Sequence, residues 1–560
     1  MHHEQQHSHS SQGGRDTRSQ NRFHRRHFLQ SMLAGSAVLV LGRPGWAGAP
    51  TYADGVVFHD RSGSGTRDDR AVGIPGVRVS NGRQIAVTDK EGRWRLPLEE
   101  ERTVFFVIKP RNWRTVLTNH NLPRFHYIHD PAGSPTLRYE GLPPSGPLPA
   151  SLDFPLYPQD EPDDFEVILC GDPQPRNGRE VGYIAQSAIP ELAREDAAFG
   201  ISLGDIMFDN LQYFEPLNEA FSHVDKPWYN VLGNHDLNFD TPDNEHANDT
   251  FMRIYGPTYY AFEYGPVHFM VLNNIDWMGQ NSDRPRATSN YRGYIGERQL
   301  AFVKEELSHV PKDKLTVIAM HIPLISPDSR MRRLRTIDAD KLYALLEDRP
   351  HTVSLSAHRH WHGQFYHGAE EGWHGEQPHH HMIMATLCGS WFRGLPKQHG
   401  IPHARMTDGT PRGYAVMRFS GHTYKLKGYR TIDGNRDRQM HIECPNTVNR
   451  DELKDTTFSS NFYNGCERSV VRYRFDDSKS WQPMERVIAP DPAYMRVFEH
   501  EQRMERPSPF LAMRDPSPCY HLWQSTLPPD LSAGTHLLEV EATDTYGTTY
   551  HQTRPVRVSG

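Results

Sequence analysis

Cysteine is scarce in this chain of 560 residues, and the few present follow no metal-binding pattern. The five cysteines are odd in number and lack the paired spacing of a cysteine zinc site. Cys170 and Cys388 lie in apolar, strand-like runs and are interpreted as core residues, whereas Cys444 and Cys466 are a candidate pair. This pattern argues against a cysteine-ligated metal module and against a disulfide framework.

An excess of one sign of charge is also lacking. The sequence has 62 Lys and Arg against 69 Asp and Glu, a formal net charge of -7. A mildly acidic protein is not typical of general nucleic-acid binders or of proteins that bind anionic membranes. No apolar run approaches the length of a transmembrane helix, and no internal repeat is evident. We therefore expect no general nucleic-acid binding and no transmembrane segment.

Residues 1–49 have the pattern of an export signal. A twin-arginine box spans His24–Gln30, the run Ser31–Leu41 is small and apolar, and Ala47–Ala49 resembles a cleavage site. A disordered basic tail is the alternative interpretation, but the three parts occur in the order that an export signal requires. We therefore predict a twin-arginine signal peptide with a disordered tail, and a periplasmic or extracellular location.

Residues 50–152 have an all-β pattern. Short apolar runs alternate with polar residues, as at Val77 and Val79, and Asn81-Gly82 supplies a turn. The segment Gly76–Pro97 resembles the transthyretin-like β-sandwich. A structural module is favoured over a carbohydrate-binding one, and Pro143–Pro149 and then Pro155–Pro162 are interpreted as a linker.

Residues 163–405 have the alternating pattern of an α/β domain. Hairpin strands are expected at Tyr259–Tyr264 and Val267–Leu272, and Pro190 is expected to disturb the first helix. The other expected strands are Phe165–Cys170, Phe199–Leu203, Trp228–Leu232, Leu315–Met320, Thr352–Ser356 and Met382–Leu387. The expected helices are Glu180–Glu195, Leu211–Val224, Glu297–Ser308 and Asp338–Leu346.

Residues 410–560 return to an all-β pattern and predict a C-terminal β-sandwich. Gly413–Phe419 and Thr423–Arg430 read as a hairpin, and Gly534–Gly547 reads as an edge hairpin of an immunoglobulin-type sandwich. Between them, Glu443–Pro518 is rich in proline and irregular, and the pattern assigns no element there.

Chemistry-bearing side chains follow the ends of five expected strands, which is where open α/β sheets place their sites. After Trp228–Leu232, Gly233 allows a sharp turn and is followed by an amide, an imidazole and a carboxylate. On its own this block would be an ordinary polar turn. The full set of strand-end blocks is Gly171-Asp172-Pro173-Gln174, Gly204-Asp205, Gly233-Asn234-His235-Asp236, His321-Ile322-Pro323 and Ala357-His358-Arg359-His360.

These five blocks, in this order, resemble the calcineurin-like metallophosphoesterase family. The resemblance implies an αββα four-layer core, here flanked by two β-sandwich domains, and a dinuclear centre whose ions share Asp205. It implies that His235 contacts the phosphoryl group and that Asp236 orients His235. It implies these metal ligands: Asp172, Gln174, Asp205 and His360 for the first ion, and Asp205, Asn234, His321 and His358 for the second.

Gln174 departs from the family pattern, in which many members have His at this position. Gln resembles subgroups that act on nucleotide diphosphates or phosphoproteins, and it offers a neutral oxygen where His offers nitrogen. We therefore expect Mn2+ to support activity better than Zn2+, with Fe as a further alternative. A second departure, Ala357 where Gly is usual, is expected to be tolerated.

Three further residues are candidates for binding substrate. Asp209 and Asn210 either line the site or cap the following helix, and Arg393 either clamps a phosphate or lies on the surface. The predicted function is metal-dependent hydrolysis of a small-molecule or polymeric phosphoester, with a slight preference for phosphodiesters or nucleotide diphosphates. The alternatives are a broad phosphomonoesterase and an exported protein that binds glycan or cell wall through its β domains around a non-catalytic, metal-stabilised core.

Overall fold

The structure is a computed structural model that describes residues 51–99, 102–280, 288–327, 329–397, 400–432, 434–505 and 510–560. The chain divides into two units, Met1–Ala49 and Pro50–Gly560. The predicted export signal, residues 1–49, lies outside the described residues. No helix among the described residues combines the length and the apolar character needed to cross a membrane.

The N-terminal part is built from two small sheets with a common core. The alternation expected from the sequence is present in β5, where Trp94 and Leu96 are buried and Arg93 and Arg95 are exposed. One sheet contains β1 (Tyr52–His59), β2 (Val72–Gly73), β5 (Arg93–Pro97), β7 (Trp113–Arg114) and β11 (Phe154–Pro158). The other contains β3 (Arg78–Ser80), β4 (Ile85–Val87), β6 (Thr103–Ile108) and β10 (His126–His129), and β8 (Val116–Leu117) pairs with β9 (Pro123–Arg124).

Strand β11 lies in the stretch that the sequence assigned to a linker. It pairs in parallel with β1 through Val57 and Phe154, so it belongs to the N-terminal sheet. The prolines argued against a strand here. Proline is nevertheless tolerated in a strand at positions where its nitrogen would donate no hydrogen bond to a neighbouring strand.

The first sheet of the α/β core has the strand order β14-β13-β12-β23-β24. Strands β12 (Asp164–Cys170), β13 (Phe199–Ser202) and β14 (Trp228–Asn230) run parallel, and β23 (Gly413–Ser420) pairs antiparallel with β12. Strand β24 (Thr423–Thr431) follows as the edge. The hairpin assigned by sequence to the C-terminal sandwich is therefore part of the core sheet, which corrects that expectation.

The second core sheet has the order β15-β16-β19-β20-β22-β21. Its strands are β15 (Tyr260–Tyr264), β16 (Val267–Val271), β19 (Thr316–Ala319), β20 (Thr352–Ser356), β22 (His379–Ile383) and β21 (Gly363–His367). Strand β22 begins earlier than predicted because its histidines are satisfied inside the sheet. His381 Nδ1 lies 2.6 Å from the Ser354 hydroxyl and His379 Nε2 lies 2.8 Å from the same oxygen. Beyond β22, the Gly171 N–H donates to the Ala385 carbonyl, which joins the two sheets at the end of β12.

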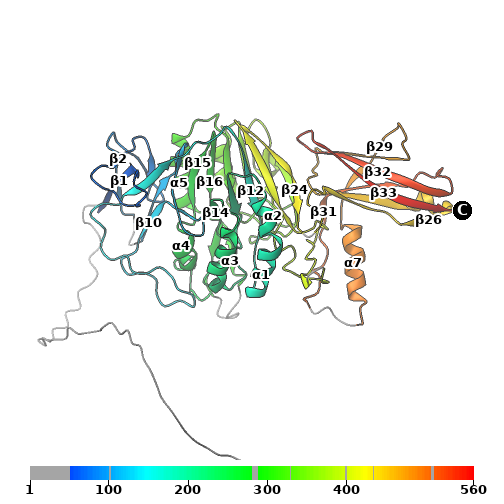
Figure 1. The fold of residues 1–560 in the computed structure, drawn as a ribbon, viewed down its shortest axis with the longest axis horizontal. Coiled ribbons are helices and arrows are strands. Elements are labelled where there is room, and N and C mark those ends of the chain that lie inside the picture. The colour runs from blue at the N-terminus through cyan, green and yellow to red at the C-terminus, as the bar shows by residue number, and fades with distance from the viewer. Residues whose placement is uncertain are drawn as a thin grey trace, which may run out of the picture. The chain divides into compact units, whose positions relative to one another are not determined.

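Helices cover the outer faces of both core sheets. Helices α1 (Gly178–Ser187) and α2 (Ile189–Ala193) are separated at Ala188, because Pro190 begins a new helix. Figure 1 shows α1 beside α3 (Phe214–Ser222), which follows the 3-10 turn η1 (Leu211–Tyr213). The remaining core elements are α4 (Asp249–Tyr255), β17 (Ile275–Trp277), β18 (Tyr291–Gly293), α5 (Glu297–His309), α6 (Ala339–Leu346) and η2 (Ala369–Glu371).

The buried side chains explain this packing. Val167 and Leu169 of β12 share a cluster with Phe269 and Val317 of the second sheet, so the two sheets pack face to face. The alternate residue Ile168 faces the other way and packs with α1 and α3. Leu307 of α5 and Leu346 of α6 belong to the cluster of the second sheet.

The C-terminal part contains two further sheets around one apolar core. One is formed by β25 (Met440–Glu443), β27 (Thr457–Phe462), β31 (Cys519–Thr526) and β30 (Glu485–Ala489). The other is formed by β26 (Thr447–Asn449), β33 (Thr549–Ser559), β32 (Gly534–Thr543), β28 (Val470–Phe475) and β29 (Gln482–Pro483). The stretch left unassigned by sequence contains η4 (Arg450–Asp455) and α7 (Pro492–Gln502).

Buried ion pairs attach the N-terminal strands to the core. Lys109 Nζ lies 2.6 Å from a Glu161 carboxylate oxygen, and their side chains are 6% and 0% exposed. Arg78 of β3 pairs with Glu263 of β15 at 2.8 Å, and Lys314 pairs with the same carboxylate at 2.9 Å. We call Arg78, Lys109, Glu161, Glu263 and Lys314 the ionic clamp.

All five cysteines are free and buried. The candidate pair Cys444 and Cys466 is therefore not bonded in this structure.

Candidate functional site

The strand-end blocks converge where the two core sheets meet. β12, β13 and β14 of the first sheet, together with β19 and β20 of the second, carry the five blocks just beyond their carboxyl ends. Asp205, His321 and His358 each place a ligand atom within 4.8 Å of the others. The sequence prediction that distant blocks form one centre therefore has a geometric basis in the structure.

Two glycines are required for this approach. A Cβ on Gly204, whose φ is +89°, would lie 2.4 Å from His321 Nδ1. A Cβ on Gly233 would lie 1.9 Å from the Asp205 backbone nitrogen. At Gly233 the sequence predicted a sharp turn; the structure adds that absence of a side chain lets two strand ends come together.

The backbone of the site is strained. Non-glycine residues with positive φ are uncommon, and each costs on the order of 1–3 kcal/mol when the surrounding structure enforces it. Such residues cluster at active sites and ligand clamps. Those among the predicted site residues are Asp172, Gln174, Asp205, Asp209, His358 and His360.

The three predicted histidine ligands are oriented in the same way. One ring nitrogen of each faces a backbone carbonyl: His321 Nδ1 lies 2.7 Å from Leu203, His358 Nε2 3.0 Å from Arg333, and His360 Nδ1 2.6 Å from Gly389. A carbonyl can only accept, so these nitrogens carry hydrogen and the opposite nitrogens are left as lone-pair donors. Metal-ligating histidines are held in this manner.

The free nitrogens face the acidic and amide ligands. His321 Nε2 lies 3.3 Å from Asp205, 3.1 Å from the Asn234 side-chain oxygen and 3.1 Å from His358 Nδ1. His360 Nε2 lies 3.8 Å from Asp172. The second Asp172 oxygen, Oδ1, is buried without a hydrogen-bond partner. An orphaned buried carboxylate oxygen among histidine lone pairs fits a divalent cation.

The charges of the site shift the pKa values of its members. Burial raises the pKa of Asp172 well above its usual range, and the charge of Asp205 adds to this effect. Burial lowers the pKa of His358 well below its usual range, as the neighbouring His321 also does. For His321 burial acts in the same direction, but the Asp205 carboxylate overcomes it and raises the pKa to about 9.

Gln174 lies inside the cluster. Its amide nitrogen donates to Asp205 at 2.9 Å, and its amide oxygen lies 3.8 Å from the Cys388 sulfur. A half-turn of the amide would present the oxygen to the same space, which is the atom a metal ligand needs.

His235 and Asp209 form a pair at the edge of the cluster. His235 Nδ1 lies 2.5 Å from an Asp209 carboxylate oxygen, and the ring stacks on Phe208 at 4.5 Å. Although burial opposes it, the charge of Asp205 and the hydrogen bond to Asp209 raise the pKa of His235 to about 9. Asp209 thus lines the site, and Asn210 precedes η1 without a side-chain cap hydrogen bond.

Asp236 has a different place from the one expected. Its carboxylate accepts from the backbone N–H groups of Gly233, Ile206 and Met207 at 2.9, 3.1 and 2.9 Å. It therefore fixes the loops after β13 and β14 to each other, while Asp209 holds the His235 ring. The resemblance implied that Asp236 orients His235, whereas in the structure the ring nitrogen of His235 faces Asp209.

Other residues near the site carried no recognisable sequence signal. Tyr139, from the N-terminal part, donates to the Asp209 carbonyl at 3.0 Å. Trp391 stacks on His360 with ring centroids 3.8 Å apart, and Tyr291 lies edge-on to His358 at 6.1 Å. Arg393, which the sequence did single out, donates to the Ala512 carbonyl at 3.3 Å. Such contacts depend on long-range packing, which no local motif encodes.

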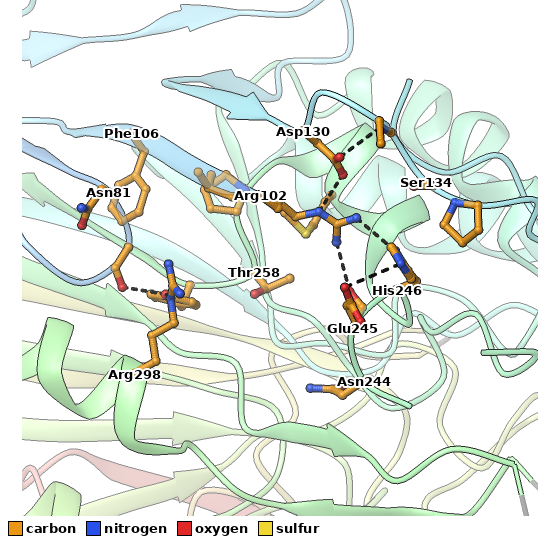
Figure 2. A pocket seen from close by; sticks show the side chains of 18 residues that line it. Asn81, Arg102, Phe106, Asp130, Ser134, Asn244, Glu245, His246, Thr258 and Arg298 are labelled. Atoms are coloured by element: carbon orange, nitrogen blue, oxygen red, sulfur yellow. Dashed lines mark hydrogen bonds and ion pairs between the residues drawn. The ribbon is translucent and has the colours of Figure 1, made fainter. Parts of the chain in front are cut away.

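A separate cavity of about 930 Å³ lies between the N-terminal part and the core and contains none of the predicted site residues. Figure 2 shows Arg102 directed at Asp130 on one side and at Glu245 and His246 on the other. Arg102 also pairs with Asp249 at 2.7 Å. Because the Arg102 guanidinium is already paired with these residues, we interpret the cavity as a polar interface between two parts of the fold.

Comparison with known proteins gives the family. Residues 61–139 match the model described as "N terminal of Calcineurin-like phosphoesterase", and residues 381–550 match the one described as "C terminal of Calcineurin-like phosphoesterase". No curated protein matches the chain. Both segments therefore match the calcineurin-like phosphoesterases, a class of ester hydrolases, as the strand-end blocks predicted.

A solved structure is also similar, the purple acid phosphatase PPD1 from seeds of yellow lupin (Lupinus luteus). The identity is 11% and the TM-score 0.34, and the match covers 68% of this chain and 64% of that one. The chain thus spans less than two thirds of that structure, and a likeness at this level adds no weight to the family assignment.

Proposed function

We propose that this protein hydrolyses phosphoester bonds at a dinuclear metal centre. The observation that carries the proposal is the set of three histidines, each tied by one nitrogen to a backbone carbonyl. The other nitrogens of His321 and His360 face buried carboxylates, and that of His358 faces His321. Asp172, Gln174, Asp205 and His360 would hold one ion, and Asp205, Asn234, His321 and His358 the other. Two such ions, when bound, activate water as a nucleophile and neutralise the phosphoryl oxygens.

The chain's own residues would perform the remaining tasks. Asp209 fixes the His235 ring through Nδ1, so Nε2 is the atom available to a substrate. A histidine in that position can hydrogen-bond a phosphoryl oxygen or give a proton to the leaving oxygen. Asp236 fixes the loops on which Asp205 and His235 lie, and the His235 N–H donates to Asp205 at 2.8 Å.

The proposal extends to the architecture and the location. The face-to-face sheets with helices outside support a four-layer αββα core over residues 163–405, extended by the β23–β24 hairpin. The paired sheets at each end support β-sandwich domains, a transthyretin-like one over 50–152 and a C-terminal one within 410–560. Residues 1–49 would direct export by the twin-arginine route to the periplasm or beyond, where contact of the β domains with cell wall or glycan is a further hypothesis.

The substrate preference rests on Gln174. A neutral amide oxygen makes the first site harder than histidine would, which favours Mn2+ over Zn2+. Because Gln at this position resembles subgroups that act on nucleotide diphosphates, phosphodiesters or nucleotide diphosphates are the preferred substrates over monoesters. A broad phosphomonoesterase is the competing function.

A substrate panel on full-length, Mn2+-reconstituted protein tests the proposal. We expect faster hydrolysis of bis(p-nitrophenyl) phosphate and of a nucleoside diphosphate than of p-nitrophenyl phosphate, and lower rates after reconstitution with Zn2+. Faster hydrolysis of the monoester would establish the phosphomonoesterase instead. Absence of turnover on every ester with both metals would reject the hydrolase.

A further inference from the structure

Three arginines from separate segments meet around Trp391, beside the predicted first metal position. Arg176, two residues after Gln174, donates to the Trp391 carbonyl at 2.9 Å. The guanidinium of Arg514 lies over the indole ring, 5.1 Å from its centroid. Arg393 follows in the same loop and donates to the Ala512 carbonyl, two residues before Arg514.

Trp391 is held in an unfavourable conformation. Its φ is +55° and that of Phe392 is +49°, a region that bulky residues rarely adopt. The indole stacks on His360 and lies under the guanidinium of Arg514, and its Nε1 is buried without a hydrogen-bond partner. Backbone strain such as these positive φ angles persists only where the surrounding structure enforces it, and it is common at residues that clamp a ligand.

The cluster carries excess positive charge. Burial lowers the pKa of Arg393, and the charges of Arg514 and Arg176 lower it further, so the three guanidinium groups repel one another. Glu180 is the carboxylate that opposes this effect, and it is already paired with Arg176 at 2.5 Å. In the part of the chain that the structure describes, neither Arg393 nor Arg514 has a carboxylate within ion-pair distance, and the Arg393 Nε is buried without a partner.

We propose that Arg176, Arg393 and Arg514 form a subsite for a second phosphoryl group of the substrate. Planar guanidinium groups bind phosphate through paired, charge-assisted hydrogen bonds, and an anion would relieve the mutual repulsion of the three. Trp391, which contacts Arg176 and Arg514 and stacks on His360, links this subsite to the predicted first metal position. The inference rests on the proposed function and narrows it to substrates that carry at least two phosphoryl groups.

The subsite also gives the C-terminal part a role. Arg514 lies between α7 and β31, within the segment matched by the C-terminal family model. Its guanidinium reaches the ring that covers a predicted metal ligand of the core. The C-terminal part thus completes the substrate site.

Binding of two phosphonates to full-length, Mn2+-loaded protein tests the subsite. Methylenediphosphonate carries a second phosphoryl-like group and methylphosphonate does not, and neither is an ester that the enzyme can hydrolyse. By calorimetry we expect Arg514→Ala to weaken methylenediphosphonate about tenfold, as expected for one lost charge-assisted hydrogen bond, and methylphosphonate less than threefold. Arg514→Lys, which keeps the charge but not the planar contact with Trp391, should fall between wild type and Arg514→Ala.

Arg503→Ala is the matched control, because Arg503 is an exposed arginine of the same part whose ion-pair partner among the described residues is Glu499 of α7. It should change neither affinity. If Arg514→Ala leaves both affinities unchanged, or weakens both ligands by the same factor, the subsite is overturned. Turnover of the full ester panel by the same wild-type protein tests the hydrolase separately, so one proposal can fail while the other stands.

Discussion

The protein buries two clusters of charged residues, and they differ in the groups that pair with their carboxylates. In the ionic clamp, Lys109 lies 2.6 Å from Glu161 and Arg78 lies 2.8 Å from Glu263. At the site, no lysine or arginine in the described part of the chain lies within ion-pair distance of the Asp172 and Asp205 carboxylates, whose ion-pair neighbours are His321 and His360.

The difference separates a structural cluster from a binding site. Where protein cations match the carboxylates, the cluster stabilises the attachment of two parts of the fold, because a broken buried pair leaves an uncompensated charge. Where carboxylates meet histidines on a left-handed backbone, the described part of the chain supplies no lysine or arginine to match them. Removal of a charge should therefore cost stability in the clamp and activity at the site.

The largest effect is expected for Asp205→Asn. This carboxylate would bridge both ions and also accepts from the His235 N–H, so its loss would disturb both the metals and the histidine proposed to act on the phosphoryl group. We predict a fall in kcat of about 10³-fold, the upper end of the effect of removing one preorganised electrostatic group. Steady-state turnover of the preferred ester measures it. Turnover close to that of the wild type would contradict a bridging role for Asp205.

The opposite result is expected for Glu161→Gln. The substitution leaves Lys109 buried without its carboxylate, which costs about 3 kcal/mol. Urea unfolding should show this loss, while the folded fraction keeps the kcat of the wild type. Glu467→Gln, at an exposed glutamate, is the control and should shift stability by less than about 0.5 kcal/mol. A change in kcat with intact stability would contradict the structural role of the clamp.

Metal removal should distinguish the two clusters again. A ligand at 100 times its Kd stabilises the native state by about 2.7 kcal/mol, so Mn2+ should raise the Tm of chelator-treated protein. Asp172→Asn should remove much of that rise, whereas Glu161→Gln should retain it despite its lower starting Tm. A rise of equal size in wild type and Asp172→Asn would show that the metal binds elsewhere.

The smallest effect is the acid sensitivity of the clamp. Although burial opposes it, the charges of Lys314 and Arg78 lower the pKa of Glu263 from 4.5 to about 2. A depressed folded-state pKa contributes stability that is present above pH 4.5 and is lost as the pH falls toward 2. Glu263→Gln should therefore flatten the dependence of unfolding free energy on pH in that window. Equal slopes for the two proteins would remove Glu263 from the clamp.

The sequence predicted the local parts of the site well. Each strand-end block follows a short apolar strand, and the strands Thr352–Ser356 and Asp164–Cys170 lie where the pattern placed them. The blocks could be found because strand, turn and ligand are contiguous in the chain. Helix α7 was missed although Asp491-Pro492 offers a start signal, and there the Asp491 side chain accepts from Ala493 and Tyr494 N–H groups.

What the sequence did not predict depends on pairing between distant segments. The β23–β24 hairpin would show the same alternation of apolar and polar residues in the core sheet as in a sandwich. Its pairing with β12 shows that it belongs to the core sheet. Asp209 as the partner of His235, and Arg514 beside Trp391, are contacts across about 26 and about 120 residues of chain that no local spacing encodes. The clearest case is His235, whose ring contacts Asp209 and not the neighbouring Asp236.

Turnover by His235→Ala tests the central claim most directly. His235 holds no predicted metal position, so the variant should keep the metal content of the wild type while the catalytic group is removed. The account predicts a loss of kcat of about 10²–10⁴-fold on the preferred ester, the usual contribution of a positioned acid or base. Wild-type turnover in this variant, with metal content unchanged, would contradict it and favour a metal-stabilised binding protein.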